Sequence, residues 1–192
     1  FERKNIIYKI NPKDMMMKTL KLAALILVLS LSQALAGNTN WNFDKSHSSV
    51  TFDVSHMVIT SVTGNFKSFD GKVSTKGDGF EGASIEFSVD INSVDTDNAD
   101  RDKHLQSDDF FNAEKFPKMT FKSTSMKKST GKNYKLTGWL TIRDVRKKVT
   151  LDVKYNGMVK GPWDKTRAGF KLTGEIDRFD YGLKWNKALE AG

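Results

Sequence analysis

The chain has 192 residues, no cysteine and a formal net charge of +8 at neutral pH. Without cysteine, disulfides, thiol chemistry and cysteine-ligated metals are excluded, so the fold must be stabilised by its core alone. Residues 1–36 hold six basic and two acidic side chains, and residues 37–192 hold 25 and 21. The globular part is therefore only mildly basic, and its lysines alternate with Asp and Thr rather than clustering. This pattern does not favour nucleic-acid binding.

The first 36 residues have the character of a targeting segment. Three methionines at 15–17 are followed by Lys18 and Lys21, by an apolar run over 22–31, and by the small residues Ala34 and Ala36. A basic start, a short apolar stretch and a small-x-small site are typical of a secretory signal peptide. The alternative is a transmembrane anchor, but the apolar run is shorter than the roughly 20 residues that a span needs.

This segment predicts where the protein acts. We expect a signal peptide over 15–36, cleaved near Ala36–Gly37, and we take residues 1–14 to be upstream or non-native sequence. The expected location is periplasmic or secreted, with no stable membrane anchor. Residues 37–192 are long enough for one domain, and no repeat or low-complexity linker divides them.

Short segments of the mature region carry apolar residues at every second position, which indicates half-buried antiparallel strands. The expected strands are 41–44, 48–59, 62–75, 82–91, 118–127, 134–142, 147–159 and 167–179. A sheet with one apolar face must hide that face by closing into a barrel or by packing on a second sheet. The predicted fold class is therefore mainly β.

Two stretches depart from this alternation. Phe66 and Phe69 are three residues apart, so both face inward only if a bulge near Lys67–Ser68 inserts a residue into the strand over 62–75. Residues 93–117 lack the two-residue period. Within them we expect a short helix over 99–106, capped by Asp or Asn, as part of a lid over one mouth of the barrel.

Five stretches, in this order, resemble the YceI-like family of secreted or periplasmic lipid-binding proteins. They are DKSHSSV at 44–50, GNFKSFDG at 64–71, RDKHLQSDDFF at 101–111, FPKMTFKS at 116–123 and YGLKWN at 181–186. The resemblance implies a lipocalin-like antiparallel β-barrel of eight strands with a short helical lid. It also implies an elongated apolar pocket that takes a polyisoprenoid, an isoprenoid quinone or a similar long-chain amphiphile.

One feature departs from the family pattern. Family members continue past the Asn-Lys-Ala-Leu-Glu motif with a glycine-containing turn and a final strand, whereas this sequence stops at Gly192. We therefore expect residues 37–192 to be a C-terminally truncated domain that lacks its last strand. An unclosed barrel would expose two strand edges.

The candidate ligand-binding residues are the aromatic and aliphatic side chains expected to face inward, together with three polar ones. An ordinary packed core explains the apolar residues about as well as a pocket does. The apolar candidates are Phe52, Val54, Phe66, Phe69, Phe87, Val89, Phe110, Phe111, Phe121, Phe170 and Leu172. The polar candidates are His56, in phase with its strand's apolar face, and Arg101 and His104 on the lid helix. For the histidines the alternatives are a satisfied core residue and a helix-terminus ion pair.

Catalysis has little support in the sequence. Gly-x-Ser-x-Gly, a phosphate-cradling glycine loop and His-x-x-x-His are absent, and the acidic residues over 95–109 are typical of caps and solvated surface. We predict no catalytic residue, no metal site, no cofactor and no enzyme activity. Two alternatives remain open: an enzyme of unknown type that uses Arg101 and His104, and a ligand-free stress-response module. The oligomeric state is also open, a homodimer included.

Overall fold

The computed structural model describes residues 37–56, 60–77, 79–161 and 164–185. The upstream segment 1–14 and the signal peptide expected over 15–36 lie outside the described residues. The described residues from Asn38 onward form one compact unit.

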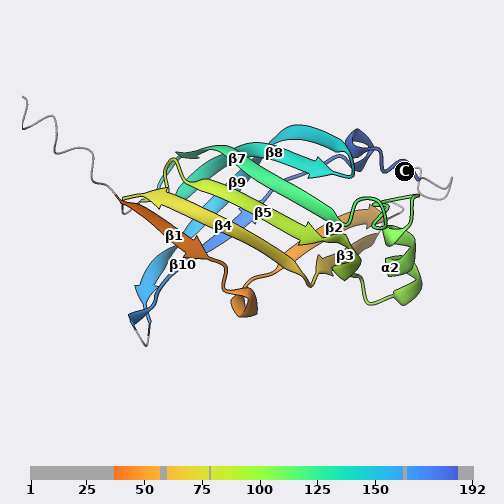
Figure 1. Ribbon diagram of the computed structural model, residues 1–192, viewed down its shortest axis with the longest axis horizontal. Coiled ribbons are helices and arrows are strands. Elements are labelled where there is room, and N and C mark those ends of the chain that lie inside the picture. Colours follow the sequence, from red (N-terminus) through yellow and green to blue (C-terminus); the bar gives the residue numbers. More distant parts are fainter. Residues whose placement is uncertain (1–36, 57–59, 78, 162–163, 186–192) are drawn as a thin grey trace, which may run out of the picture. The chain divides into compact units, whose positions relative to one another are not determined.

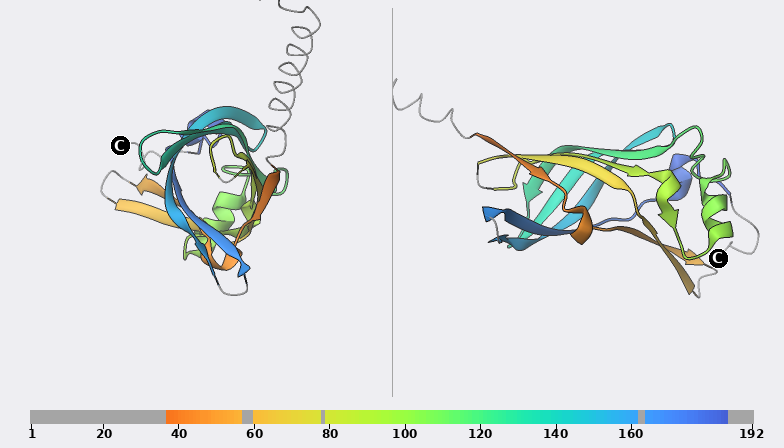
Figure 2. Two further views of the ribbon diagram at one scale, coloured as in Figure 1. Left: turned by 90° about the vertical axis from the view of Figure 1, so that its left-hand side faces the viewer. Right: turned by 60° about the horizontal axis from the view of Figure 1, so that its bottom comes forward.

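Seven antiparallel strands form the main sheet, in the spatial order β1-β4-β5-β7-β8-β9-β10. The strands are β1 (Asn38–Asn42), β4 (Phe69–Lys76), β5 (Ser84–Asp90), β7 (Lys118–Lys128), β8 (Asn133–Ile142), β9 (Val145–Lys160) and β10 (Thr166–Thr173). The sheet curls strongly around its long axis (Figures 1 and 2). The mainly β, barrel-like fold class is therefore confirmed, in the form of a half-barrel. Among the described residues, the edge strands β1 and β10 are each paired on one side only.

A smaller sheet of three strands lies near one end of the main sheet. It contains β2 (Val50–His56), β3 (Thr60–Phe66) and β6 (Val94–Asp95). The prediction of one bulged strand over 62–75 was wrong, because β3 and β4 belong to different sheets. The Lys67 N–H donates to the Ser93 carbonyl and the Ser68 N–H to Ser93 Oγ, so this backbone leaves the strand ladder. Phe66 and Phe69 are nonetheless both buried, as the spacing required.

Cross-strand register divides the main sheet into two faces. Gly71, Phe87, Phe121 and Leu140 lie opposite one another in an inward row, and Lys72, Glu86, Lys122, Trp139 and Lys148 form the neighbouring outward row. The register shifts between Ser123 and Ser125 and between Gly169 and Phe170. Such irregularities bend strands and increase their twist, which helps a sheet to curl.

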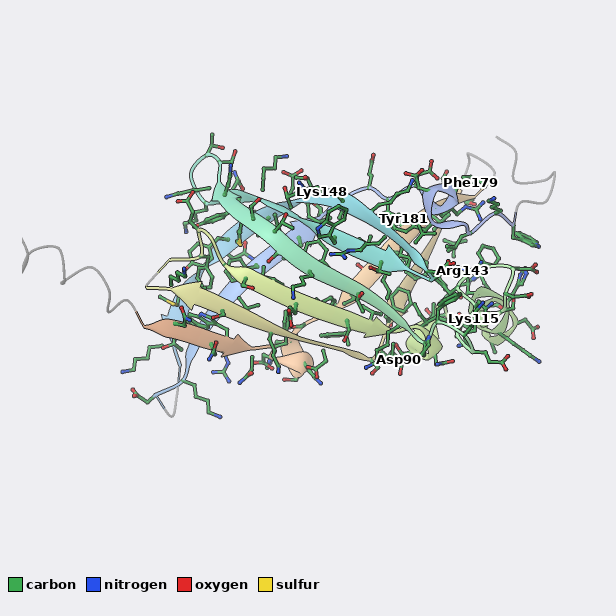
Figure 3. All side chains as sticks on the ribbon, turned by 45° about the horizontal axis from the view of Figure 1, so that its top comes forward. Asp90, Lys115, Arg143, Lys148, Phe179 and Tyr181 are labelled. Carbon is green, nitrogen blue, oxygen red and sulfur yellow. The ribbon has the colours of Figure 1, made fainter. Side chains whose placement is uncertain are left out.

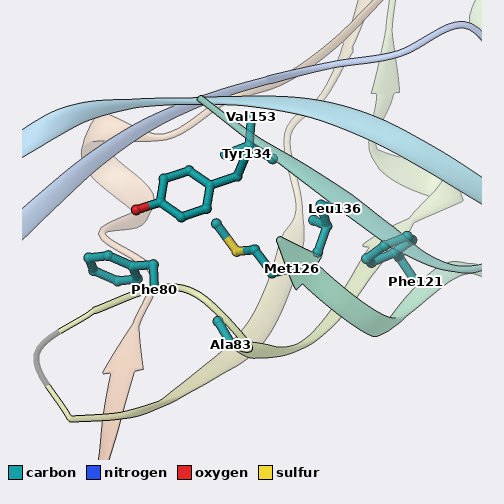
Figure 4. Close-up of a cluster of buried hydrophobic side chains, with 7 residues drawn as sticks. All are labelled: Phe80, Ala83, Phe121, Met126, Tyr134, Leu136 and Val153. Atoms are coloured by element: carbon teal, nitrogen blue, oxygen red, sulfur yellow. The ribbon is translucent and has the colours of Figure 1, made fainter. Parts of the chain in front are cut away.

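Buried apolar clusters occupy both ends of the curled sheet. One cluster gathers at the β4–β5 and β7–β8 turns and is drawn in Figure 4; it contains Phe80, Ala83, Phe121, Met126, Tyr134, Leu136 and Val153. Two further clusters lie toward the opposite end, which carries α2 (Figure 1). They are built around Phe66, Phe69, Val89, Ile91, Val94 and Ala113, and around Ile142, Tyr181 and Leu183.

The helix α2 (Ala99–Gln106) has the predicted bounds, and the Asn98 side chain caps it by accepting the Arg101 N–H. Short 3-10 turns are η1 (Lys45–His47), η2 (Ile91–Ser93) and η4 (Arg178–Tyr181). The strand expected over 167–179 ends earlier, at Thr173. The Asp177 carboxylate accepts the Phe179 N–H and starts η4 there instead. Within the described ranges, no helix is long and apolar enough to cross a bilayer.

Candidate functional site: an apolar cavity inside the curled sheet

The inner face of the curled sheet encloses a cavity of about 2730 Å³. Ligand pockets for small molecules usually measure roughly 300–1,000 Å³, so this space is large enough for a long molecule. Strands from the whole width of the main sheet contribute to its wall, as do β2 and the segment around α2. The apolar part of its wall follows from the alternation, because every second residue faces it in β5 (Ile85, Phe87, Val89) and in the first half of β9 (Val149, Leu151, Val153).

Thirteen of the fourteen predicted ligand-binding residues line this cavity. They are Phe52, Val54, Phe66, Phe69, Phe87, Val89, Arg101, His104, Phe110, Phe111, Phe121, Phe170 and Leu172. The fourteenth, His56, ends β2, and its side chain lies outside the described part of the structure. Whether these residues bind a ligand stays a prediction; the structure shows that they share one space.

The lining residues differ in solvent exposure, and this difference shows which of them form the closed wall of the cavity and which lie at its opening. Phe66, Phe69, Val89 and Phe121 are almost fully buried in the core clusters. In contrast, Val54 on β2 is 44% exposed and Leu172 on the edge strand β10 is 49% exposed. Exposed aliphatic side chains on an inward face indicate that the cavity is open along the side near β10 and β2.

Aromatic rings close the cavity at the end that lies away from α2. The Phe80 ring is 4.7 Å from Phe170 and 5.3 Å from Trp41, centroid to centroid, and Tyr155 lies 5.1 Å from Phe170. The Trp41 indole N–H donates to the buried Thr75 hydroxyl at 3.2 Å. Sequence reasoning missed Phe80 because it follows a glycine-rich turn and has no strand periodicity.

Two glycines make room for the phenylalanines of the wall. A Cβ on Gly138 would lie 2.4 Å from the Phe121 ring, and one on Gly71 would lie 2.9 Å from Phe87 and 2.6 Å from the Glu86 carbonyl. Because real side chains do not approach so closely, each ring lies over a strand position that only glycine can fill. This packing brings the phenyl groups close to the backbone of the neighbouring strand.

Arg101 is held at the cavity margin by a polar network centred on Thr96. Its Nε donates to Thr96 Oγ1 at 2.7 Å and its Nη2 to the Thr96 carbonyl at 2.6 Å. The Asp102 carboxylate in turn accepts the Thr96 N–H at 2.9 Å and hydroxyl at 2.6 Å. Thr96 is only 5% exposed. Arg101 forms no ion pair with a described residue, so its positive charge remains available to a bound group.

His104, the second polar candidate, is fixed by one carboxylate and two rings. Its Nε2 lies 3.0 Å from Asp109 Oδ2, and its imidazole meets Phe110 and Trp185 edge-on at 5.0 and 4.8 Å. The expected contact between His104 and a carboxylate is therefore present in the structure, and His104 still lines the cavity. Trp185 was not among the predicted site residues, since it lies 81 positions further along the sequence.

A polar cluster spans the gap between the two edges of the main sheet. Asp44, which follows β1, accepts the Ser46 hydroxyl at 2.7 Å, contacts His47 Nδ1 at 3.0 Å, and accepts from Arg167 Nε on β10 at 3.3 Å. These contacts, the Ser46 hydrogen bond first, lower the pKa of the Asp44 carboxyl to about 2. Sequence reasoning missed this cluster because Asp44 and Arg167 are 123 residues apart.

The same region offers little to a metal. Among the described residues, no group of three or more His, Asp or Glu side chains is arranged to hold an ion. The arrangement is thus that of a large, mainly apolar space with cationic side chains at its margin: Arg101, which is held by Thr96, and Arg167, which is held by Asp44.

Comparison with known proteins agrees with this architecture. Residues 41–192 match the model of the YceI-like domain family. A UPF0312 protein of Photorhabdus laumondii is 39% identical over 171 residues, covering 88% of each chain. A UPF0312 protein of Staphylococcus aureus is 38% identical over 157 residues, covering 80% of this chain and 88% of its own.

Solved structures share the fold. The YceI protein of Campylobacter jejuni has a TM-score of 0.62 at 39% identity, over 74% of this chain and 83% of its own. BcnA of Burkholderia cenocepacia has a TM-score of 0.56 at 25% identity, over 67% of this chain and 97% of its own. A polyisoprenoid-binding domain of Saccharophagus degradans has a TM-score of 0.51 at 17% identity, over 74% of this chain and 80% of its own. At this low identity, the similarity shows a shared fold only. The chain therefore belongs to the YceI-like family.

Proposed function

We propose that the protein binds a polyisoprenoid, an isoprenoid quinone or a similar long-chain amphiphile inside the curled sheet, and that it acts in the periplasm or outside the cell. The observation that carries this proposal is the 2730 Å³ cavity, whose wall is mainly apolar and includes residues from every strand of the main sheet. Each buried CH₂ group contributes about 0.8 kcal/mol, so a long hydrocarbon chain gains much from leaving water there.

A structural relative supports the ligand class. The Saccharophagus degradans domain with this fold is described as polyisoprenoid-binding.

The polar groups suggest how such a ligand is oriented. Arg101, held by Thr96, and His104, held by Asp109, both line the cavity next to α2. The opposite end is closed by the Phe80, Phe170 and Trp41 rings. We therefore place the head group at α2 and the hydrocarbon tail toward Phe80. Binding of this kind requires no chemical step, and we propose that the protein is not an enzyme.

The test begins with mature protein purified from a periplasm. Mass spectrometry of its organic extract should reveal a stoichiometric isoprenoid or quinone, and native mass spectra should show the same added mass. A clean apo mass that stays unchanged after incubation with such lipids would contradict the proposal. A turnover activity lost in His104→Ala, with the lipid still bound, would favour the enzyme alternative.

A pair of variants on β5 tests whether the lumen is the site. Phe87→Asp introduces a carboxylate on the inward face, whereas Ser88→Asp introduces the same charge one residue further, on the outward face. We expect Phe87→Asp to lose the lipid and Ser88→Asp to retain it. Tight lipid binding by a folded Phe87→Asp protein would remove this residue from the ligand site.

A further inference from the structure

The outer face of β8, β9 and β10 carries an unusual set of side chains. Trp139 on β8 lies directly opposite Lys148 on β9, and Lys122 on β7 lies opposite it on the other side. The guanidinium carbon of Arg146 lies 4.8 Å from the centre of the Trp139 ring. A tryptophan on a solvent-facing strand position is thus surrounded by cations. Figure 3 shows Lys148 on this part of the sheet.

The charges on this face are not balanced. Lys122 and Lys135 are neutralised by Glu86 and Asp152, at 2.7 and 2.6 Å. Four further cations form no ion pair with any residue that the structure describes. They are Arg146, Lys148, Lys154 and Lys171, which we call, together with Trp139, the outer cationic face.

Two of these cations oppose each other directly. Lys154 on β9 and Lys171 on β10 are cross-strand partners. Like charges in this position destabilise an antiparallel pair, so the arrangement is unfavourable in the free protein. It becomes favourable when an anionic surface approaches and neutralises both ammonium groups.

We propose that the outer cationic face docks the protein onto the surface of a bilayer that contains anionic lipids. Lys and Arg near such a surface are attracted electrostatically, and tryptophan prefers the head-group level because its ring is apolar and its N–H is polar. A single-stranded nucleic acid fits less well, since it requires several stacking aromatics along a groove. This face is the outside of a curled sheet, and Trp139 is its only aromatic side chain among the described outward positions of β8, β9 and β10.

The position of the face adds a second argument. β10 is an edge strand, and its Lys171 shares the face of Lys154 by register while it also borders the cavity, together with its neighbours Phe170 and Leu172. Head groups bound at Lys171 would therefore lie beside the exposed Leu172, where the cavity is open. Docking in this orientation brings the opening of the cavity to the membrane. The docking itself does not depend on which lipid the cavity holds.

Vesicle co-sedimentation tests this proposal. The mature protein is mixed with vesicles of phosphatidylcholine alone or of phosphatidylcholine with phosphatidylglycerol. We expect binding to the anionic vesicles only, and its loss as salt is raised from 0.1 to 1 M, where the screening length falls from about 10 to about 3 Å. Equal binding to both vesicles, or binding that 1 M salt leaves unchanged, would overturn the proposal.

Variants locate the surface. The double variant Arg146→Gln/Lys148→Gln should bind anionic vesicles about 25-fold more weakly, because each removed charge weakens binding roughly fivefold. Lys72→Gln/Lys76→Gln removes the same charge from the outward face of β4 and should bind like the unmodified protein. Trp139→Thr should weaken binding at every salt concentration at which binding is detected. Equal losses in both double variants, or no loss in the first, would contradict the assigned face.

Discussion

Arg167 on the edge strand β10 donates a hydrogen bond from Nε to the carboxylate of Asp44, which follows the opposite edge strand β1. Among the described residues, backbone hydrogen bonds do not join these two edges. The ion pair therefore links, through side chains, the two edges that a closed ring would join through its backbone. It lies at the cavity, since both residues line it.

The first prediction concerns this link. Asp44→Asn removes the charge that Arg167 and His47 face, so we expect a small fall in the thermal midpoint and faster hydrogen exchange in β10 at neutral pH. Glu114→Gln is the control, because Glu114 is exposed and has no contact of this kind. Unchanged exchange in β10 would mean that the edges are held by other groups.

The second prediction is the pH dependence of the same group. The pKa of Asp44 is lowered to about 2 in the folded protein from an ordinary value of 3.8. Its contribution to stability is therefore complete above about pH 4 and is lost as the pH falls toward 2. In thermal melts, the difference between the unmodified protein and Asp44→Asn should shrink over this range. A difference that stays constant down to pH 2 would contradict the assigned pKa.

Arg143 is the basis of the third prediction. In the β8–β9 turn, its Nη1 lies 3.3, 3.1 and 3.4 Å from the carbonyls of Asp108, Phe110 and Gly182, and Figure 3 shows it near α2. Arg143→Leu should lower the free energy of unfolding by about 1–3 kcal/mol, since these hydrogen bonds come from a charged donor. Amide hydrogen exchange should become faster in residues 105–113. Arg143→Lys keeps the charge without the planar fork and should recover only part of the loss. Unaltered exchange in that loop would exclude this role.

The fourth prediction uses the contact between Gly138 and Phe121. Gly138→Val places side-chain atoms where the Phe121 ring lies, and overpacking of this kind costs about 1–3 kcal/mol. Thr141→Val, at another outward position on β8, is the control and should be nearly neutral. Adding Phe121→Leu to Gly138→Val should restore part of the loss in urea unfolding. Additive losses in the double variant would disprove the steric explanation.

Tyr181 is the basis of a fifth prediction, in which a substitution does not lower the free energy of unfolding. Its hydroxyl is buried and has no hydrogen-bond partner among the described residues, and burial raises its pKa. Since an unsatisfied buried hydroxyl costs free energy, Tyr181→Phe should leave stability unchanged or raise it by up to about 1 kcal/mol. A clear destabilisation in urea unfolding would show that the hydroxyl is bonded after all.

The sequence predicted those parts of the fold that depend on local pattern. β5 and β9 alternate strongly, and α2 has an Asn cap and acidic residues in its first turn, so both kinds of element were found. The split between β3 and β4 was missed because the backbone at Lys67 and Ser68 bonds to Ser93, which no local pattern reveals. The early end of β10 depends likewise on the Asp177 cap.

The candidate site likewise contains residues that the local sequence pattern predicts and residues that it does not. Inward-facing residues such as Phe87 and Phe170 follow from the two-residue period. The pairs Asp44–Arg167 and His104–Trp185 do not, since each joins residues far apart in the sequence through the curvature of the sheet. The register shifts in β7 and at Gly169–Phe170 help the sheet to curl, and alternation alone does not locate them.

The most direct test of the central claim is photo-crosslinking of the mature protein with an isoprenoid that carries a benzophenone at its tail end. Peptide mapping should place the label on residues near Phe80, Phe170 and Tyr155, and unlabelled isoprenoid should compete it away. A label confined to outward positions, or no label under conditions that saturate binding, would contradict the account of a lipid chain held inside the curled sheet.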